Sequence, residues 1–132
     1  MIILPSLLNA NTYNIKEQLQ ILKDKGIDHL HVDVMDGQFV PSQAFGPNTV
    51  NDLKNMTDFK LDVHLMIENP EKHILLYKNA DIITVHYEST RHLYRAIQLI
   101  KDMGLKACVA INPATSVSMI EEVLPMLDQV LV

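Results

Sequence analysis

The sequence predicts an α/β fold, a (β/α)8 TIM barrel of which residues 1–132 form a single incomplete domain with about five βα units and a sixth strand. Two observations predict it. Apolar runs typical of strands alternate with amphipathic helical runs along the whole chain, which is the pattern of parallel βαβ units. Several strand runs carry His or Asp at every second position, as expected where one face of each strand points to a barrel interior. A doubly wound open sheet is the competing architecture, but no Gly-rich phosphate loop follows an early strand.

Six short runs are expected to be strands because they are apolar or alternate between apolar and polar residues. They are residues 2–6, 30–34, 60–66, 81–86, 106–111 and 129–132. The stretch HLHVDVMDG (29–37) shows the alternation clearly, since its apolar residues share one face and its His, Asp and Met residues share the other. The segment LDVHLM (61–66) repeats that division. The polar faces of the two strands are therefore expected to meet inside the barrel.

Helices are expected between these strands. The segment 13–26 places Ile15, Leu19 and Leu22 on one face and ends at a glycine. Segment 69–79 begins with Asn and then Pro, the favoured order for a helix start. The other expected helices are residues 89–104, which form the longest one, residues 114–124 and, as a weaker prediction, residues 47–56.

The composition favours a protein that acts on small molecules. The formal net charge is −5, and without a basic stripe the chain does not fit a nucleic-acid binder. The apolar N-terminal stretch 1–11 is too short to span a membrane and lacks the basic flank of a signal peptide. Cys108 is the only cysteine, which excludes an internal disulfide and a multi-thiolate metal site. We expect a cytoplasmic protein with neither nucleic-acid nor membrane partners.

Three polar residues of the two alternating strands suit a metal ion. His31 and Asp33 lie two apart on one strand, and His64 occupies a similar position on the next alternating strand. Two imidazoles and one carboxylate are suitable ligands for Zn²⁺, Fe²⁺ or Mn²⁺. The spacing is equally compatible with three hydrogen-bonded interior side chains. His86 and Glu88 share a face of a later strand and are either supporting groups for such a site or ordinary surface residues.

Several motifs together resemble the ribulose-phosphate 3-epimerase family. They are PSLLNAN, HVDVMDGQFVP, FGP, LDVHLMIENPE, ITVHYE and INPATS, in this order and spacing, and they extend over the entire chain. The resemblance implies a TIM barrel that interconverts D-ribulose 5-phosphate and D-xylulose 5-phosphate in the pentose phosphate pathway. It also implies one divalent metal ion, often zinc or iron, bound at the site.

The resemblance also implies roles for individual residues. His31, Asp33 and His64 match metal ligands of the family, and Asp33 also matches one of its two catalytic aspartates. Ser6 matches a serine that contacts the substrate, and His64 also lies at the substrate site. Met35 and Met66 match methionines that pack beside the reacting carbons.

The chain departs from the family pattern in two ways. Asn9-Ala10-Asn11 replaces a usual S-A-D, and Ser42 replaces a usual Asn, which leaves open a related epimerase that acts on allulose 6-phosphate, although FGP (45–47) favours the ribulose enzyme. The family's second catalytic aspartate and Gly-rich phosphate loops are also absent from these 132 residues. We therefore expect the 132-residue chain alone to be inactive. The alternative function is an inactive structural module that associates with itself, and we expect a homo-oligomer.

Overall fold

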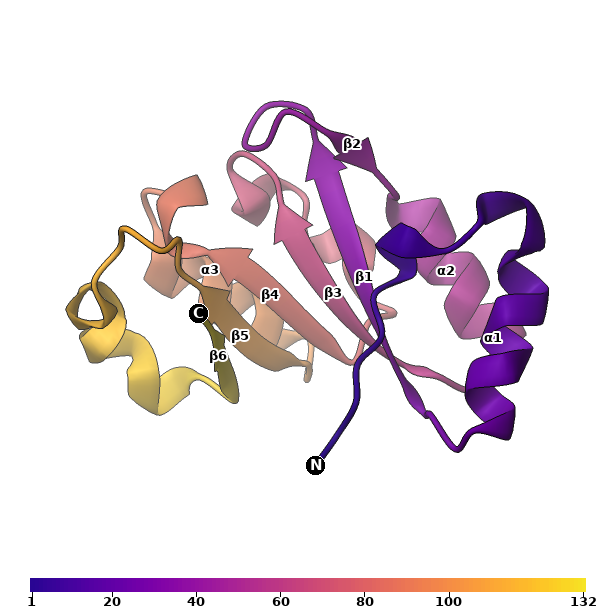
Figure 1. Cartoon of the computed structure of the whole chain (residues 1–132). Coiled ribbons are helices and arrows are strands. Elements are labelled where there is room, and N and C mark those ends of the chain that lie inside the picture. Colours follow the sequence, from indigo (N-terminus) through magenta and orange to yellow (C-terminus); the bar gives the residue numbers. More distant parts are fainter.

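The computed structural model describes residues 1–132 as a mixed α/β fold built on one six-stranded sheet (Figure 1). The strand order is β2-β1-β3-β4-β5-β6, and every neighbouring pair is parallel except β1 and β2. The strands are β1 (His29–Asp36), β2 (Gln43–Ala44), β3 (Lys60–Met66), β4 (Ile82–His86), β5 (Lys106–Ala110) and β6 (Gln129–Leu131). Apart from the short antiparallel strand β2 at one edge, the strands are parallel and follow one another in chain order, which is the wall of a partial TIM barrel, so the predicted fold class is confirmed.

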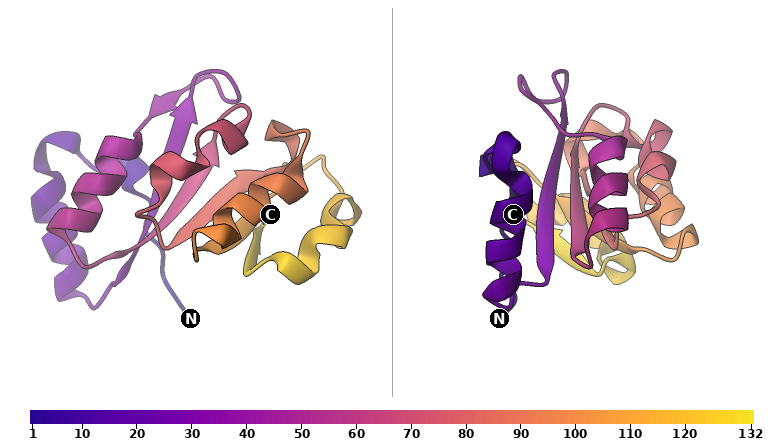
Figure 2. Two further views of the ribbon diagram at one scale, coloured as in Figure 1. Left: turned by 180° about the vertical axis from the view of Figure 1, so that it is seen from behind. Right: turned by 90° about the vertical axis from the view of Figure 1, so that its right-hand side faces the viewer.

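Helices cover one face of this sheet and leave the other open. Seen from behind, α2, η4 and α3 lie across the sheet (Figure 2), whereas β1, β3 and β4 are uncovered from the front (Figure 1). The helices are α1 (Ile15–Asp24), α2 (Pro47–Met56) and α3 (Leu93–Asp102), with 3₁₀ turns η1 (Leu7–Asn9), η2 (Thr12–Asn14), η3 (Pro70–Lys72), η4 (Ile74–Tyr77), η5 (Tyr87–Ser89) and η6 (Val117–Met126). None of these helices is both long and apolar enough to cross a membrane.

The core lies between the sheet and the helices that cover it. Apolar residues at every second strand position are buried there, namely Leu30, Val32, Val34, Leu61, Val63, Leu65, Ile83, Val85, Ala107 and Val109. Because successive side chains of a strand point to opposite faces, the residues between them must face the open side. The predicted division of the two alternating strands is therefore confirmed.

The N-terminal segment does not form the predicted strand at residues 2–6. Only one parallel bridge joins Ser6 to His31, and the His31 N–H donates to the Pro5 carbonyl at 3.0 Å. Ile2 and Ile3 stay 66% and 56% exposed. Pro5 has no N–H for a ladder, which limits the pairing. The short strand β2 was not predicted, since two residues have no detectable periodicity.

Two predicted helices are wound more tightly than expected. Segment 69–79 forms η3 and η4, whose turns close through i to i+3 bonds such as His73 N–H to the Pro70 carbonyl at 2.8 Å. Segment 114–124 becomes η6, which contains Pro125. The apolar pattern locates these segments but does not distinguish 3₁₀ from α winding. The segment 89–104 is also shorter than predicted, since α3 has 10 residues, the same length as α1 and α2.

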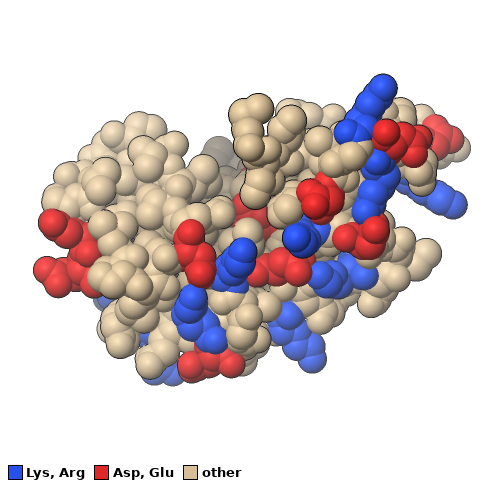
Figure 3. Space-filling model, turned by 90° about the horizontal axis from the view of Figure 1, so that it is seen from below, with Lys and Arg blue, Asp and Glu red and all other residues tan.

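Charged side chains of both signs are interleaved at the end of the sheet where the strands begin (Figure 3). Three pairs join a lysine near the end of a helix to an aspartate that precedes a strand. They are Lys23 with Asp58, Lys54 with Asp81, and Lys101 with Asp128. This end of the molecule is held together by matched charges.

Candidate metal centre

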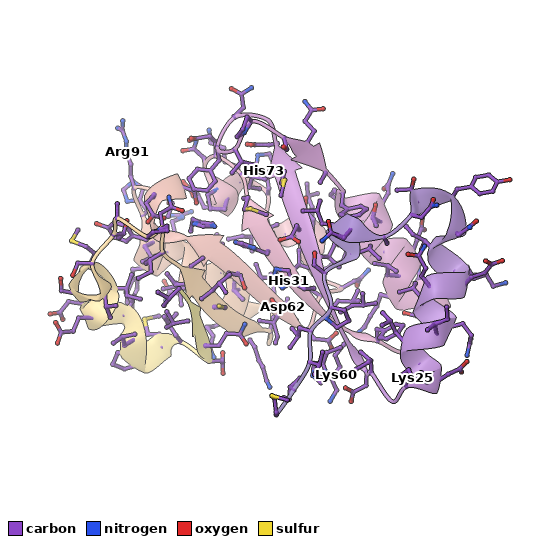
Figure 4. All side chains as sticks on the ribbon, viewed as in Figure 1. Lys25, His31, Lys60, Asp62, His73 and Arg91 are labelled. Carbon is purple, nitrogen blue, oxygen red and sulfur yellow. The ribbon has the colours of Figure 1, made fainter.

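The register of β1 and β3 brings the predicted site residues together. Asp33 lies opposite His64, and His31 lies opposite Asp62. All of these side chains point to the open face of the sheet, where His31 and Asp62 lie side by side near its middle (Figure 4). Strand alternation and parallel register thus place two histidines and two aspartates in one small area.

Three donor atoms of this group form a nearly equilateral triangle. Asp33 Oδ1 lies 3.2 Å from His31 Nε2 and 3.2 Å from His64 Nδ1, and the two ring nitrogens are 3.4 Å apart. Ligand atoms at tetrahedral zinc distances lie about 3.3–3.4 Å from one another. The arrangement of His31, Asp33 and His64 therefore fits a divalent ion without rearrangement, and the three residues form a possible metal-binding triad.

His31 is oriented by a second carboxylate. Its Nδ1 lies 3.2 Å from Asp62 Oδ2, which holds a ring hydrogen on Nδ1 and leaves Nε2 as the nitrogen that a metal ion would meet. Asp62 is only 3% exposed and also accepts a hydrogen bond from Thr84 Oγ1 at 3.2 Å. Without a metal, burial lowers the pKa of His31, but its hydrogen bonds to Asp33 and Asp62 outweigh burial and raise the pKa to about 9.

His64 is oriented by a chain of two further side chains. Its Nε2 lies 2.8 Å from His86 Nε2, and His86 Nδ1 lies 3.3 Å from Glu88 Oε2. Burial, together with the nearby His64, lowers the pKa of His86. Burial opposes ionisation of Glu88, but hydrogen bonds from Thr115 and the Asn112 N–H hold its pKa below the ordinary value. The chain therefore runs from a buried imidazole to an ionised carboxylate.

Asp33 divides its two oxygens between different partners. Oδ1 faces the two imidazoles, whereas Oδ2 accepts a hydrogen bond of 2.6 Å from the Ser6 hydroxyl. Burial opposes ionisation, but hydrogen bonds from His31, His64 and Ser6 keep the pKa of Asp33 far below its usual range. Asp33 is therefore an ionised carboxylate with a fixed orientation.

The two methionines of the site lie on the same open face. Met35 and Met66 are opposite one another in the register, two residues beyond Asp33 and His64 toward the ends of their strands. Both are half-buried, so their thioethers border the triangle on the side where the strands end. Cys108 lies in the same cross-strand row as His64, but burial raises the pKa of its thiol to about 11, which disfavours a thiolate ligand.

The structure brings together all residues that the sequence analysis selected. His86 and Glu88, for which two interpretations were open, contact His64 in series. The alternation of LDVHLM places Asp62 on the polar face of its strand but predicts no role for it. The D-x-H spacing of Asp62 and His64 was the available signal, but the partner of Asp62 depends on the register between β1 and β3, which the sequence does not specify.

Together, the parallel barrel wall and the inward-facing His and Asp side chains define a TIM-barrel protein with a site suited to a divalent metal. Residues 2–132 match the model of the ribulose-phosphate 3-epimerase family. The chain belongs to this family.

Curated relatives agree with this assignment. The chain is 47% identical over 136 residues to the chloroplastic ribulose-5-phosphate-3-epimerase of Arabidopsis thaliana, with 100% of this chain and 48% of the relative covered. It is 46% identical over 129 residues to the ribulose-phosphate 3-epimerase of Bacillus subtilis, with 96% of this chain and 59% of the relative covered. The chain thus spans about half to three fifths of the length of these relatives.

A solved structure of low sequence identity shares the fold. The crystal structure of phospho-2-dehydro-3-deoxyheptonate aldolase from Thermotoga maritima superposes with a TM-score of 0.68 at 11% identity, covering 90% of this chain and 35% of that one. At this identity the likeness supports the barrel architecture alone.

Proposed function

We propose that the chain supplies the metal-holding side and one acid–base group of an epimerase that interconverts D-ribulose 5-phosphate and D-xylulose 5-phosphate at C3. The observation that carries the proposal is the triangle of His31, Asp33 and His64, which lies within the sequence matched by the family. Relatives named ribulose-phosphate 3-epimerase support the same reaction.

Epimerisation beside a ketone requires a proton to leave one face of a carbon and to return on the other. Asp33 is suited to one of these transfers because it is ionised, oriented, and able to present Oδ2 while Oδ1 faces the imidazoles. A divalent ion held by His31, Asp33 and His64 would stabilise the negative charge that develops on the substrate oxygens.

Ser6, Met35 and Met66 complete the surroundings of this carboxylate. The Ser6 hydroxyl donates to Asp33 Oδ2, and we propose that it turns to the substrate when a sugar oxygen competes for it. The two half-buried methionines offer an apolar and polarisable border beside the reacting carbons. Such a border limits water near a carbanion-like intermediate.

The second proton transfer needs a carboxylate on the opposite face of the substrate. Asp62 is turned to the far side of the His31 ring, and Glu88 lies behind His86, so neither of these carboxylates on the open face reaches the triangle. We propose that the partner of Asp33 belongs to the part of the barrel that this chain does not span.

An epimerase for allulose 6-phosphate is the second candidate. The departures at Asn9, Asn11 and Ser42 from the usual family residues leave room for it, whereas the FGP segment and the names of the relatives favour the ribulose enzyme. An inactive self-associating module is not favoured, because the donor triangle and its supporting hydrogen bonds are intact.

The proposal includes the setting of the protein. We propose a cytoplasmic homo-oligomer of the pentose phosphate pathway that binds a phosphosugar and one Zn²⁺, Fe²⁺ or Mn²⁺ ion. Nitrogen and oxygen donors in this proportion suit all three ions, so metal analysis is needed to choose among them.

A chimera tests the function. Residues 1–132 are joined to the part of the Bacillus subtilis relative that the match leaves uncovered, and interconversion of the two ketopentose phosphates is followed in a coupled assay. We expect turnover that a chelator removes and that added metal restores. A folded, metal-loaded chimera that acts on allulose 6-phosphate alone would favour the second candidate, and one that acts on neither substrate would contradict both.

A further inference from the structure

We propose that His86 and Glu88 form a positioning arm, in which His86 accepts the Nε2 hydrogen of His64 and Glu88 fixes His86 from behind. The arm would thereby dictate that Nδ1 is the nitrogen through which His64 meets the metal. This inference rests on the proposed function because it concerns the same donor triangle.

The hydrogen positions of the arm follow from one another. His64 Nδ1 faces Asp33 Oδ1 and His31 Nε2, and its Nε2 lies 2.8 Å from His86 Nε2. Only one of these two Nε2 atoms can hold the hydrogen in a neutral pair. Since His86 Nδ1 faces the carboxylate of Glu88, its hydrogen belongs on Nδ1 and its Nε2 is left as an acceptor. His64 then donates from Nε2.

The carboxylate at the end of the arm is anchored by another part of the chain. Glu88 Oε1 accepts from the Asn112 N–H at 2.7 Å and from the Thr115 hydroxyl, both in the segment that follows β5. With Oε1 occupied by these donors, Oε2 is turned to His86. The orientation of His64 on β3 therefore depends on contacts that reach through β4 to the end of β5.

The surroundings exclude water from the first link of the arm. His64 and His86 are both buried, and the Phe39 ring packs on His86 with 4.9 Å between ring centroids. A polar group in such a place needs a protein partner. His31 meets the same requirement through one carboxylate, Asp62, so the two imidazoles are held by different means.

Replacing His86 tests the arm by zinc affinity and by the position of the His64 hydrogen. Zinc affinity is measured by competition with a chromophoric chelator, and ¹⁵N spectra of the histidine rings show which nitrogen of His64 holds hydrogen. In the zinc-loaded, unmodified chain we expect hydrogen on Nε2 and the metal on Nδ1. His86→Leu should give mixed tautomers and about 10–100-fold weaker zinc binding, whereas His86→Gln, whose amide oxygen can accept, should restore most of the affinity.

Two further variants separate positioning from folding. Thr115→Val removes one donor from Glu88 without touching either imidazole, and a smaller loss of affinity with the tautomer shifted in the same direction is expected. His29→Leu is the matched control because this histidine lies on the same face at the start of β1 and pairs only with Asp28. It should leave zinc affinity unchanged, and circular dichroism monitors folding of every variant.

Some outcomes would overturn the inference. Hydrogen on His64 Nδ1 in the zinc-loaded, unmodified chain would do so, as would equal loss of affinity in His86→Leu and His86→Gln, which would indicate a packing role. The failure of the arm and that of the proposed function are distinguishable. Unchanged zinc affinity in His86→Leu of an active chimera would contradict the arm but not the proposed function. A chimera with the expected tautomers but without epimerisation would contradict the proposed function but not the arm.

Discussion

The two ends of the sheet use carboxylates in different ways. At the end where the strands begin, Asp81 Oδ2 accepts from the Leu61 N–H and from Lys54 Nζ, both at 2.8 Å. Asp128, which precedes β6, repeats this arrangement beside β5. It accepts from the Ala107 N–H at 2.8 Å and from Lys101 Nζ at 2.9 Å. Each of these carboxylates meets one cation and one backbone donor.

On the open face, the carboxylate of Asp33 meets imidazoles instead of a lysine. If a metal ion replaces the hydrogens that join the two rings to Asp33, His31 and His64 donate outward to Asp62 and His86, and the two ring lone pairs and Asp33 Oδ1 converge on one point. Three such donor atoms at 3.2–3.4 Å from one another suit a cation, which replaces the hydrogens between them.

The contrast indicates that the partner of the aspartate, a lysine or a histidine, determines whether its carboxylate stabilises the fold or is suited to a metal site. A lysine pairs its charge with the carboxylate and joins a helix to the start of a strand, whereas a histidine that donates to a second partner can offer its other nitrogen to a metal ion. The division follows the general layout of TIM barrels, in which residues at the start of strands serve stability and those toward the other end serve function.

Asn substitutions at the two kinds of aspartate should have very unequal effects on activity. In the active chimera, Asp33→Asn removes an acid–base group and a charged ligand, and the epimerisation rate should fall at least about 10³-fold. Asp81→Asn, the same change at the lysine-bound end, should leave the rate within a few-fold. Coupled kinetic assays check both. Similar losses of kcat in the two variants would erase the functional contrast.

His64 on β3 and His29 at the start of β1 should also differ in their effect on metal binding. His64→Ala removes one of the three atoms that would bind the metal. Loss of a residue that only supports a ligand, such as His86, is expected to weaken zinc binding about 10–100-fold, and His64→Ala should weaken it further. His29→Ala should bind zinc normally, since His29 contacts Asp28 instead of the triangle. Titration against a chelator measures both affinities. Equal metal content in His64→Ala and the unmodified protein would contradict the assignment of the triad.

Loss of a lysine-bound carboxylate should affect folding instead. Asp81→Ala leaves the buried Leu61 N–H without its acceptor, which is expected to lower the free energy of unfolding by about 1–3 kcal/mol. Asp102→Ala, at the exposed end of α3, is the control and should change stability little. Urea unfolding measures both. An Asp81→Ala protein as stable as the control would show that the pair with Lys54 is dispensable.

The sequence was most informative where periodicity determines the outcome. The alternation of HLHVDV and LDVHLM was sufficient to assign His31, Asp33 and His64 to one face, because side-chain direction in a strand is fixed by the backbone. The family motifs added the roles of Ser6 and the two methionines, which remain predictions.

The features that the sequence did not predict depend on contacts between segments that lie far apart in the chain. The role of Asp62 requires the β1–β3 register, and the anchoring of Glu88 requires the segment after β5 to fold back over β4. The 3₁₀ winding of η4 and η6 depends on how their apolar residues pack against the sheet, and periodicity alone is similar for both windings. Single-sequence patterns contain none of these relations.

The smallest expected effect is the pH dependence of the Asp128 pair. The hydrogen bond from Lys101, together with that from the Ala107 N–H, holds the pKa of Asp128 below its ordinary value of 3.8. As pH falls, the unfolded chain therefore binds this proton first, so the stabilisation is complete above about pH 5 and is lost as pH falls through 3.8 and below.

The Asp128→Asn variant lacks this pH-dependent stabilisation. Its deficit in unfolding free energy relative to the unmodified protein should be under about 1 kcal/mol near neutrality, because the pair is partly exposed, and should shrink between about pH 5 and pH 3. Urea unfolding at a series of pH values measures the difference, with Asp102→Asn as the control that should show no trend. A deficit that stays constant or grows on acidification would mean that Asp128 gains nothing from its charge, and that this end of the sheet is held by hydrogen bonds alone.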